Sequence, residues 1–431
     1  MKIGIYTLGC KVNQYETQAM EHELVRRGHE LVDFESIADA YIINTCSVTA
    51  VSDKKSRQMI RRAKKSAPAA VVAACGCYVQ THEDEARALG IDLLMGTNDR
   101  AKFLDLLEET VQTRQTHVEI DNALRRRDFE VLPAGGMAAR TRAMLKVEDG
   151  CVNFCTYCII PYARGPVRSL PMDEAARQVR ALREQGYREL VVTGIEISSY
   201  GHEFKDGTSL IDLLELIARE GGEMRIRLGS LEPRTVTREF CERAAKLPTL
   251  CPHFHLSMQS GCDATLRRMN RKYDTARFYE SVALLREYFD DPAITTDLIT
   301  GFPEETEEEF GETLTFLERC GFAAMHIFPY SVRPGTKAAA MAQVEMSVRE
   351  ERAARAAAVA EKLHRAYLAR CVGKTFPVLF EQDRGEGSVG HAPNYMPVTV
   401  AQKGLHNTVQ NVRVTAVDGE VLRGEIGETA E

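Results

Sequence analysis

Short apolar runs alternate with amphipathic segments along roughly the first quarter of the chain. Strands are predicted at residues 2–8, 40–44 and 69–73, and helices at 13–27, 49–66 and 81–88. Strands that alternate with helices in this way are typical of a parallel sheet covered by helices. We therefore expect an N-terminal α/β domain over residues 1–112.

The same alternation returns further along the chain and continues for six units. Strands are predicted at 142–147, 189–193, 225–228, 253–256, 294–299 and 324–328, with helices between them at 173–185, 209–220, 235–246, 274–288 and 306–319. Six such units are enough for a partial β/α barrel, in which the chemistry collects at the carboxyl ends of the strands. A long helix rich in Ala, Glu and Arg over 341–370 is expected to close this domain, which we place at 137–370.

Two further segments lack this alternation. Residues 113–136 show no core periodicity and end in Pro-Ala-Gly-Gly, which predicts a linker. Residues 371–431 hold short β-branched strands between glycine turns, at 373–381, 397–400 and 411–417. That pattern suits a small antiparallel β-barrel. The predicted fold class is therefore α/β, with a partial barrel in the centre and a small β-barrel at the end.

Composition and charge narrow the class of protein. The chain has 431 residues, of which 44% are hydrophobic and 27% charged, as in ordinary globular proteins. Its net charge of −7 means that nucleic acid is not attracted by overall charge, so any RNA contact needs a local basic patch. Twelve cysteines without a secretory leader indicate a reducing cytoplasm. No apolar run approaches the roughly 18 residues of a membrane span, so we expect no membrane segment.

Candidate chemistry concentrates in Cys151, Cys155 and Cys158, here called the central trio, which are spaced C-x3-C-x2-C just after a predicted strand. Thiolates are the natural ligands of iron–sulfur clusters, and three of them can hold a 4Fe–4S cubane while one iron stays open. Zinc is the competing metal, but it usually takes four closed ligands, and no second cysteine pair follows at a matching distance. Disulfides between thiols this close are sterically poor. The motif therefore predicts an iron–sulfur cluster.

Four more cysteines stand just past the ends of the three N-terminal strands: Cys10, Cys46, Cys75 and Cys77. Neighbouring strands of an open α/β sheet end at one carboxyl edge, where ligands bind. Any one of these thiols alone would be better explained as a buried apolar side chain. Their repeated placement favours a second three-cysteine cluster, for which either Cys75 or Cys77 could be the third ligand.

A basic segment lies on one predicted helix. Residues 54–65 carry seven basic residues in twelve, and Lys54, Arg57, Arg61 and Lys65 form one stripe at helical spacing. Charge runs are most often solvated helix faces. The alternative is contact with RNA phosphates, for which this stripe is the best candidate in the N-terminal domain.

These motifs resemble the radical S-adenosylmethionine (SAM) enzymes, and the resemblance extends over nearly the whole chain. The central trio, with Tyr157 before its last cysteine, matches their signature. The segments around Cys10, Cys46 and Cys77 are similar to the methylthiotransferase family. The sequences of residues 7–13, 257–262 and 269–273 resemble motifs of the branch that acts on threonylcarbamoyl-adenosine in tRNA. Because the family pattern is Gly-Cys-Tyr, it assigns Cys77 as the third ligand and leaves Cys75 as an extra core thiol.

The resemblance implies two 4Fe–4S clusters and SAM as cofactors. The cluster on the central trio would bind SAM, whose cleavage by one electron releases a 5′-deoxyadenosyl radical. The cluster on the N-terminal trio (Cys10, Cys46 and Cys77) would relay sulfur, and a second SAM would supply the methyl group. The expected product is 2-methylthio-threonylcarbamoyl-adenosine beside the anticodon. The nearest alternatives are sister enzymes that act on isopentenyl-adenosine in tRNA or on a ribosomal-protein aspartate. A non-enzymatic iron–sulfur or zinc RNA-binding protein is a more distant one.

The resemblance also implies contacts with SAM at the strand ends of the central domain. The residues expected there are Tyr157, Gly194, Glu196, Ser230, Glu232, Gln259 and Gly301. Carboxylates can pair with the amino group of SAM or bind its ribose hydroxyls, and glycines allow close approach of the backbone. Glu196 stands where this branch is expected to have His.

The tail and the partners follow from the same resemblance. Residues 390–395 resemble the RNA-binding TRAM module of this family, with Tyr395 as a candidate for stacking on a base. The implied partners are tRNA and an electron donor of the flavodoxin or ferredoxin type. The chain is expected to act as a monomer, with neither DNA nor a membrane as a partner.

Overall fold

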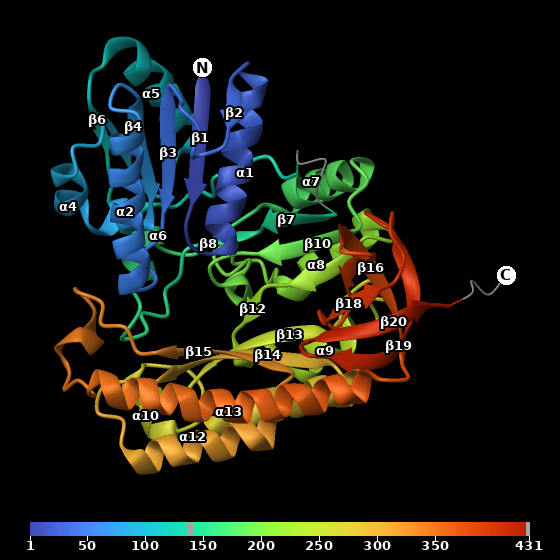
Figure 1. Cartoon of the computed structure of the whole chain (residues 1–431). Helices are drawn as coiled ribbons and strands as arrows, with labels where there is room; N and C mark the ends of the chain where they lie inside the picture. Colours follow the sequence, from blue (N-terminus) through green and yellow to red (C-terminus); the bar gives the residue numbers. More distant parts are fainter. Residues whose placement is uncertain (136–140, 428–431) are drawn as a thin grey trace.

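A computed structural model describes residues 1–135 and 141–427, in which three β-structures follow one another along the chain (Figure 1). The first is a parallel sheet of six strands in the order β2-β1-β3-β4-β5-β6. These strands are β1 (Lys2–Thr7), β2 (Glu30–Val32), β3 (Ala40–Thr45), β4 (Val71–Gly76), β5 (Leu93–Met95) and β6 (His117–Glu119). The predicted parallel sheet is confirmed. Strands β2, β5 and β6 were not predicted, because three residues are too few to show a period.

Helices cover both faces of this N-terminal sheet. They are α1 (Lys11–Arg26), α2 (Ala50–Ser66), α3 (Cys77–Thr81), α4 (Glu83–Ala88) and α5 (Arg100–Thr113). Ile42 of β3 packs in one apolar cluster with residues of α1 and α5, and its neighbour Ile43 packs in another with residues of α2. Burial on both faces explains why β3 and β4 are continuous apolar runs rather than alternating ones.

The second structure is a partial barrel of parallel strands, as the sequence predicted. One sheet holds β7 (Arg142–Lys146), β10 (Glu189–Thr193) and β11 (Arg225–Leu228). The other holds β12 (Ser230–Leu231), β13 (His253–Gln259), β14 (Ala293–Thr300) and β15 (Ala324–Pro329). Only Gly229 separates β11 from β12, so one length of chain passes from the first sheet to the second and joins them.

Helices pack around this partial barrel. They are α6 (Ile160–Arg164), α7 (Met172–Glu184), α8 (Leu210–Gly221), α9 (Arg238–Ala244), α10 (Asp263–Arg268), α11 (Thr275–Tyr288), α12 (Glu307–Cys320) and α13 (Met346–Cys371). A short antiparallel ladder of β8 (Glu148–Asp149) and β9 (Arg168–Ser169) brackets the loop that carries the central trio.

The third structure is a closed barrel in the order β16-β17-β18-β20-β19. Its strands are β16 (Thr375–Arg384), β17 (Gly387–His391), β18 (Pro397–Val400), β19 (Val409–Asp418) and β20 (Val421–Ile426). The small barrel is confirmed, but its expected fully antiparallel pairing is wrong, because β18 and β20 pair in parallel. The chain crosses over before forming the β19–β20 hairpin, which returns β20 beside β18 in the same direction.

The three structures meet around the partial barrel (Figure 1). Strands of the N-terminal sheet run toward it, while the C-terminal barrel packs against the amino-terminal ends of β7, β10 and β11. Strand β6 lies in the segment expected as a linker and extends the N-terminal sheet. Within residues 1–135 and 141–427, no helix is long and apolar enough to cross a membrane.

Candidate active site

The central trio lies on the loop between β8 and α6, at the carboxyl end of β7. The Cys158 amide donates to the Cys155 carbonyl at 2.9 Å, which fixes a turn within the loop. Thr156 ties the loop to the end of α10, since its amide donates to the Met269 carbonyl at 3.1 Å. All three cysteine residues are half-buried, and backbone hydrogen bonds order the loop that carries them.

Arg271 is a site residue to which the sequence assigned no role. Its Nη1 donates to Cys155 Sγ at 3.2 Å, and its guanidinium lies 4.9 Å from the centre of the Tyr273 ring. A guanidinium that donates to a sulfur forms a charge-assisted hydrogen bond. Arg271 therefore contacts the central trio directly and stabilises negative charge on it.

Burial shifts the pKa values of two thiols of the central trio. Burial raises the pKa of Cys151, and burial together with the neighbouring Cys155 raises the pKa of Cys158 to about 12. Such thiols stay protonated at neutral pH unless the charge of a metal displaces the proton. Among the described residues, no three Cys, His, Asp or Glu side chains gather as ligands of one metal ion.

The N-terminal trio meets at the carboxyl edge of the N-terminal sheet. Cys10 precedes α1, Cys46 follows β3, and Cys77 begins α3 just past β4. Gly9 shows how closely the chain segments approach, because it has φ +99° and a Cβ there would lie 2.7 Å from Cys46 Sγ. Only glycine suits that turn. Three thiols far apart in sequence are therefore neighbours in space, as the strand-end argument predicted.

Cys75 and Cys77 have different surroundings. Cys75 is fully buried inside β4, in an apolar cluster with Ile42 and Val71, and burial raises its pKa to about 11. Burial raises the pKa of Cys77 to about 12, and the nearby thiols of Cys10 and Cys46 add to that rise. The structure thus places Cys77 with the other two thiols and Cys75 in the core. That Cys77 is the ligand stays a prediction.

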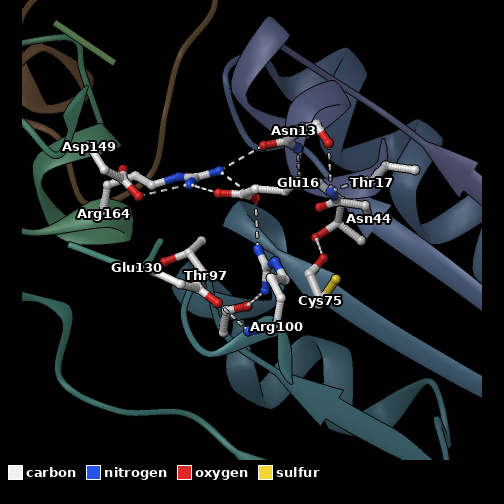
Figure 2. Close-up of polar contacts among 12 residues, drawn as sticks. Asn13, Glu16, Thr17, Asn44, Cys75, Thr97, Arg100, Glu130, Asp149 and Arg164 are labelled. Atoms are coloured by element: carbon white, nitrogen blue, oxygen red, sulfur yellow. Dashed lines mark hydrogen bonds and ion pairs between the residues drawn. The ribbon is translucent and has the colours of Figure 1, made fainter. Parts of the chain in front are cut away.

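A buried ion-pair network joins the N-terminal domain to the partial barrel (Figure 2). Glu16 of α1 is fully buried and accepts hydrogen bonds from Arg100 at 2.8 Å, from Lys146 at 3.2 Å and from Arg164. Arg164 of α6 also donates to Asn13 at 2.8 Å. Burial alone would raise the pKa of Glu16, but the three cations hold it well below its ordinary value. Because α1 starts after Cys10 and α6 follows the central trio, this network fixes one cysteine set relative to the other.

Arg333 makes a second bridge between the two parts. It is buried after β15 and donates to Asp53 Oδ2 at 2.7 Å and to Ser47 Oγ at 2.6 Å. The loop that follows Cys46 is thereby fastened over the carboxyl end of the barrel. A cavity of about 250 Å³ lies beneath it, lined by Val48 of this loop and by Tyr157 of the central loop, among others.

The expected SAM contacts divide between two cavities. Glu196 and Glu232 line one of about 490 Å³ together with Asn153 of the central loop. Burial raises the pKa of Glu196 to about 7, so this carboxyl is poised between its two protonation states at neutral pH. Tyr157 and Gln259 line the smaller cavity described above. Their roles toward SAM stay predictions.

The remaining expected SAM contacts show other surroundings. Ser230 is exposed on β12. A Cβ on Gly194 would lie 2.9 Å from the Glu148 carbonyl oxygen, and one on Gly301, at φ +63°, would lie 2.4 Å from Arg349 Cγ. Close packing within the chain therefore accounts for both glycines without a ligand, and their contact with SAM stays a prediction.

The expected RNA contacts also differ in exposure. Lys54, Arg61 and Lys65 are exposed on α2, whereas Arg57 is half-buried and pairs with Glu85 at 3.3 Å. Three of the four predicted cations are therefore free to reach a phosphate.

Tyr395 lies at the junction of the two barrels. The guanidinium of Arg227 is 4.5 Å from the centre of its ring, the His391 ring is 4.9 Å away, and Arg142 donates to its hydroxyl at 3.1 Å. In this structure the ring contributes to packing between the barrels. Its stacking on a base stays a prediction.

Comparison with known proteins places the chain among described families. Residues 145–317 match the Radical SAM superfamily, and residues 2–96 match Uncharacterized protein family UPF0004. A solved structure of the radical SAM methyltransferase TsrM from Kitasatospora setae is 14% identical, with a TM-score of 0.58 over 78% of this chain and 77% of that one. At this identity the likeness shows the fold alone.

Relatives of higher identity cover most of the chain. Threonylcarbamoyladenosine tRNA methylthiotransferase MtaB of Bacillus subtilis is 41% identical over 92% of this chain and 89% of its own length. The protein of that name from Aquifex aeolicus is 41% identical over 78% of this chain and 82% of its own. A tRNA-2-methylthio-N(6)-dimethylallyladenosine synthase of Symbiobacterium thermophilum is 32% identical over 99% of this chain and 95% of its own. Since identity above 30% spans most of both sequences in each case, the chain belongs to the radical SAM methylthiotransferase family.

Proposed function

We propose that this enzyme methylthiolates C2 of N6-threonylcarbamoyladenosine beside the anticodon of tRNA. The observation that carries the proposal is that one cavity has walls from both cysteine loops. Tyr157 lies within the central trio, Val48 lies two residues after Cys46, and both line the cavity of about 250 Å³. A reaction that breaks a C–H bond and forms a C–S bond at one carbon needs both sites beside one substrate position. The names of the relatives at 41% identity support the choice of base.

Each cysteine trio would hold one 4Fe–4S cluster. When bound, the clusters and SAM supply a radical able to break an unactivated aromatic C–H bond, together with the sulfur and the methyl group of the product. The chain itself orients these groups and limits access of water. Arg271 fixes the charge next to Cys155, while Arg333 holds the Cys46 loop over the mouth of the barrel.

The proposed partners are tRNA and an electron donor of the flavodoxin or ferredoxin type, with the enzyme acting as a cytoplasmic monomer. The exposed cations of α2, Lys54, Arg61 and Lys65, are the proposed phosphate contacts. Because the chain is acidic overall, the binding of tRNA should depend on these exposed cations of α2 and should weaken steeply as the salt concentration rises.

Two measurements test the proposal. Nucleosides from the tRNA of a deletion strain are separated by mass spectrometry, and we expect methylthio-threonylcarbamoyl-adenosine to be lost and the unthiolated base to accumulate. Iron and sulfide are counted on anaerobically purified protein, for which two clusters require about eight of each per chain. An unchanged nucleoside profile, or loss of the isopentenyl-adenosine product instead, would refute the choice of substrate.

Cysteine variants separate the roles of the two trios. Cys155→Ala should abolish formation of 5′-deoxyadenosine, because the central trio would hold the SAM-binding cluster. Cys46→Ala should preserve SAM cleavage and stop thiolation. Cys75→Ala is the matched control, because this thiol packs in the core, and it should keep both reactions. Loss of thiolation in Cys75→Ala with retention in Cys77→Ala would reverse the ligand assignment.

A further inference from the structure

A second cavity, of about 370 Å³, lies where all three parts of the chain meet. It is lined by Lys11 and Gln14 of α1, by Arg142 and Arg227 of the partial barrel, and by Tyr395 of the C-terminal barrel. Figure 1 shows α1 and the C-terminal barrel on either side of β7 and β10, around this junction. Three of the ten residues that line the cavity are cations and one, Glu381, is an anion, although the net charge of the chain is −7.

Two of the three cations already have anionic partners. Arg142 donates to Glu381 Oε2 at 2.9 Å, and Arg227 donates to Glu189 Oε1 at 2.7 Å. Lys11 differs from them. Among residues 1–135 and 141–427, no carboxylate lies within ion-pair distance of its ammonium group, and no hydrogen-bond acceptor contacts it. Its side chain is exposed at the cavity wall and available to a ligand.

The surroundings of Lys11 favour the binding of an anion. Lys11 lines the same cavity as Arg142 and Arg227, and it is the one of these three cations whose charge has no anionic partner among the described residues. An anionic ligand that enters the cavity can form a charge-assisted hydrogen bond with this ammonium. The geometry therefore suits a small carboxylate or phosphate that reaches Lys11.

Lys11 is also next in sequence to Cys10, a member of the N-terminal trio. In the proposed substrate, the threonylcarbamoyl group on N6 carries a carboxylate, and the carbon that bears N6 is separated from C2 only by N1 of the ring. With C2 beside the cluster that Cys10 would help to hold, the carboxylate on the same base would face the residues that follow Cys10. We propose that Lys11 binds the carboxylate of the threonylcarbamoyl group and selects it over uncharged N6 substituents, an inference that rests on the proposed function.

An isopentenyl group cannot form this ion pair, so binding it leaves Lys11 in the cavity without a counter-ion. Specificity arises from that difference between the two substrates. A charge-assisted hydrogen bond of this kind corresponds to about 10- to 100-fold in affinity.

The test uses the full enzyme with reconstituted clusters and two RNA anticodon stem-loops. One carries threonylcarbamoyl-adenosine, and the other carries its carboxamide analogue, which has the same shape but no charge. Dissociation constants by fluorescence anisotropy and kcat/KM for thiolation are measured with wild type, Lys11→Gln and Lys11→Arg. Lys362→Gln is the matched control, since Lys362 is exposed on α13 away from the cavity.

We expect wild type to favour the carboxylate RNA by about 10- to 100-fold and Lys11→Gln to lose most of this preference. Lys11→Arg should retain much of it, and Lys362→Gln should match wild type. An equal loss of affinity for both RNAs in Lys11→Gln would indicate a phosphate contact and overturn the inference. A lower iron content in that variant would assign Lys11 to holding the cluster, with the same consequence. Failure of the proposed function is a separate result, because wild type would then thiolate neither RNA.

Discussion

The buried network at Glu16 makes a strong prediction about stability. Glu16 is 0% exposed, and its carboxylate is shared by Arg100, Lys146 and Arg164 from three different elements. The substitution Glu16→Gln keeps the shape of the side chain and removes its charge. Three cations then remain buried with too little negative charge between them.

The magnitude follows from what the cations lose. Removing one member of a buried ion pair costs about 3–5 kcal/mol, because the remaining charge is left without a partner and without water. For a domain of about 150–250 residues, such as the partial barrel, 1 kcal/mol corresponds to roughly 2–4 °C in Tm. A loss of about 3–5 kcal/mol should therefore lower the Tm by roughly 6–20 °C. An amide still accepts a hydrogen bond, which keeps the expected value toward the lower end of that range.

The assay is thermal unfolding followed by circular dichroism under anaerobic conditions. The matched control is Glu83→Gln, which removes a glutamate that pairs with Arg87 at 2.6 Å on α4 but is 40% exposed. Exposed pairs contribute about 0–1 kcal/mol, so the control should lower the Tm by less than roughly 4 °C.

Equal changes in Tm for Glu16→Gln and Glu83→Gln would refute the argument that burial decides the cost. A stabilised Glu16→Gln variant would show instead that the network costs more to desolvate than its ion pairs return. A second measurement distinguishes local from global effects. Limited proteolysis should cut Glu16→Gln faster than the control in the segment that connects the N-terminal domain to the partial barrel.

Three further predictions concern single residues. Burial raises the pKa of Glu148 well above its ordinary value, so Glu148→Gln should be tolerated wherever the wild-type carboxyl is protonated. Relative to this variant, wild type should lose up to about 1.4 kcal/mol of stability per pH unit as the pH rises from the ordinary pKa of a glutamate toward the raised folded-state pKa, and a Tm difference independent of pH would contradict this. Tyr395→Leu removes the ring that packs near Arg227 and should lower the free energy of unfolding, measured in urea, by about 1–3 kcal/mol. A loss of RNA affinity at unchanged stability would instead favour the stacking role. Arg271→Met removes the hydrogen bond to Cys155 and a positive charge beside the central cluster. The midpoint potential of that cluster should fall by an amount on the order of 50 mV in a titration followed by EPR, and an unchanged potential would contradict the role of this contact.

The sequence predicted those features that depend on chain order and missed those that depend on side-chain geometry. Adjacent parallel strands must end at one edge, so the meeting of Cys10, Cys46 and Cys77 was predictable from three strand assignments. Arg271 was not, because 116 residues separate it from Cys155 and no periodicity links them. Strands β5 and β6 were also missed, since pairing with the existing sheet rather than local pattern creates them.

The exposure of polar residues was the least predictable property. Residues 16–18 of α1 are Glu, Thr and Gln, residue types that are mostly exposed in proteins, and all three are buried. Their partners lie up to 148 residues away, as Arg164 does from Glu16. Similarly, Tyr395 looks like an exposed aromatic until Arg142 and Arg227 of the partial barrel are placed against it.

The choice of charges at the junction has a physical consequence for the reaction. An apolar interface between two domains tolerates small sliding motions, because dispersion contacts are weakly directional. Glu16 is held from α5, β7 and α6 at once, and each of these hydrogen bonds weakens steeply when its angle changes. The network thus gives up stability that an apolar junction would provide and gains a fixed orientation. The proposed reaction, in which two metal clusters would lie beside one carbon atom, depends on that orientation, since misplacement by about 1 Å can cost about a hundredfold in rate.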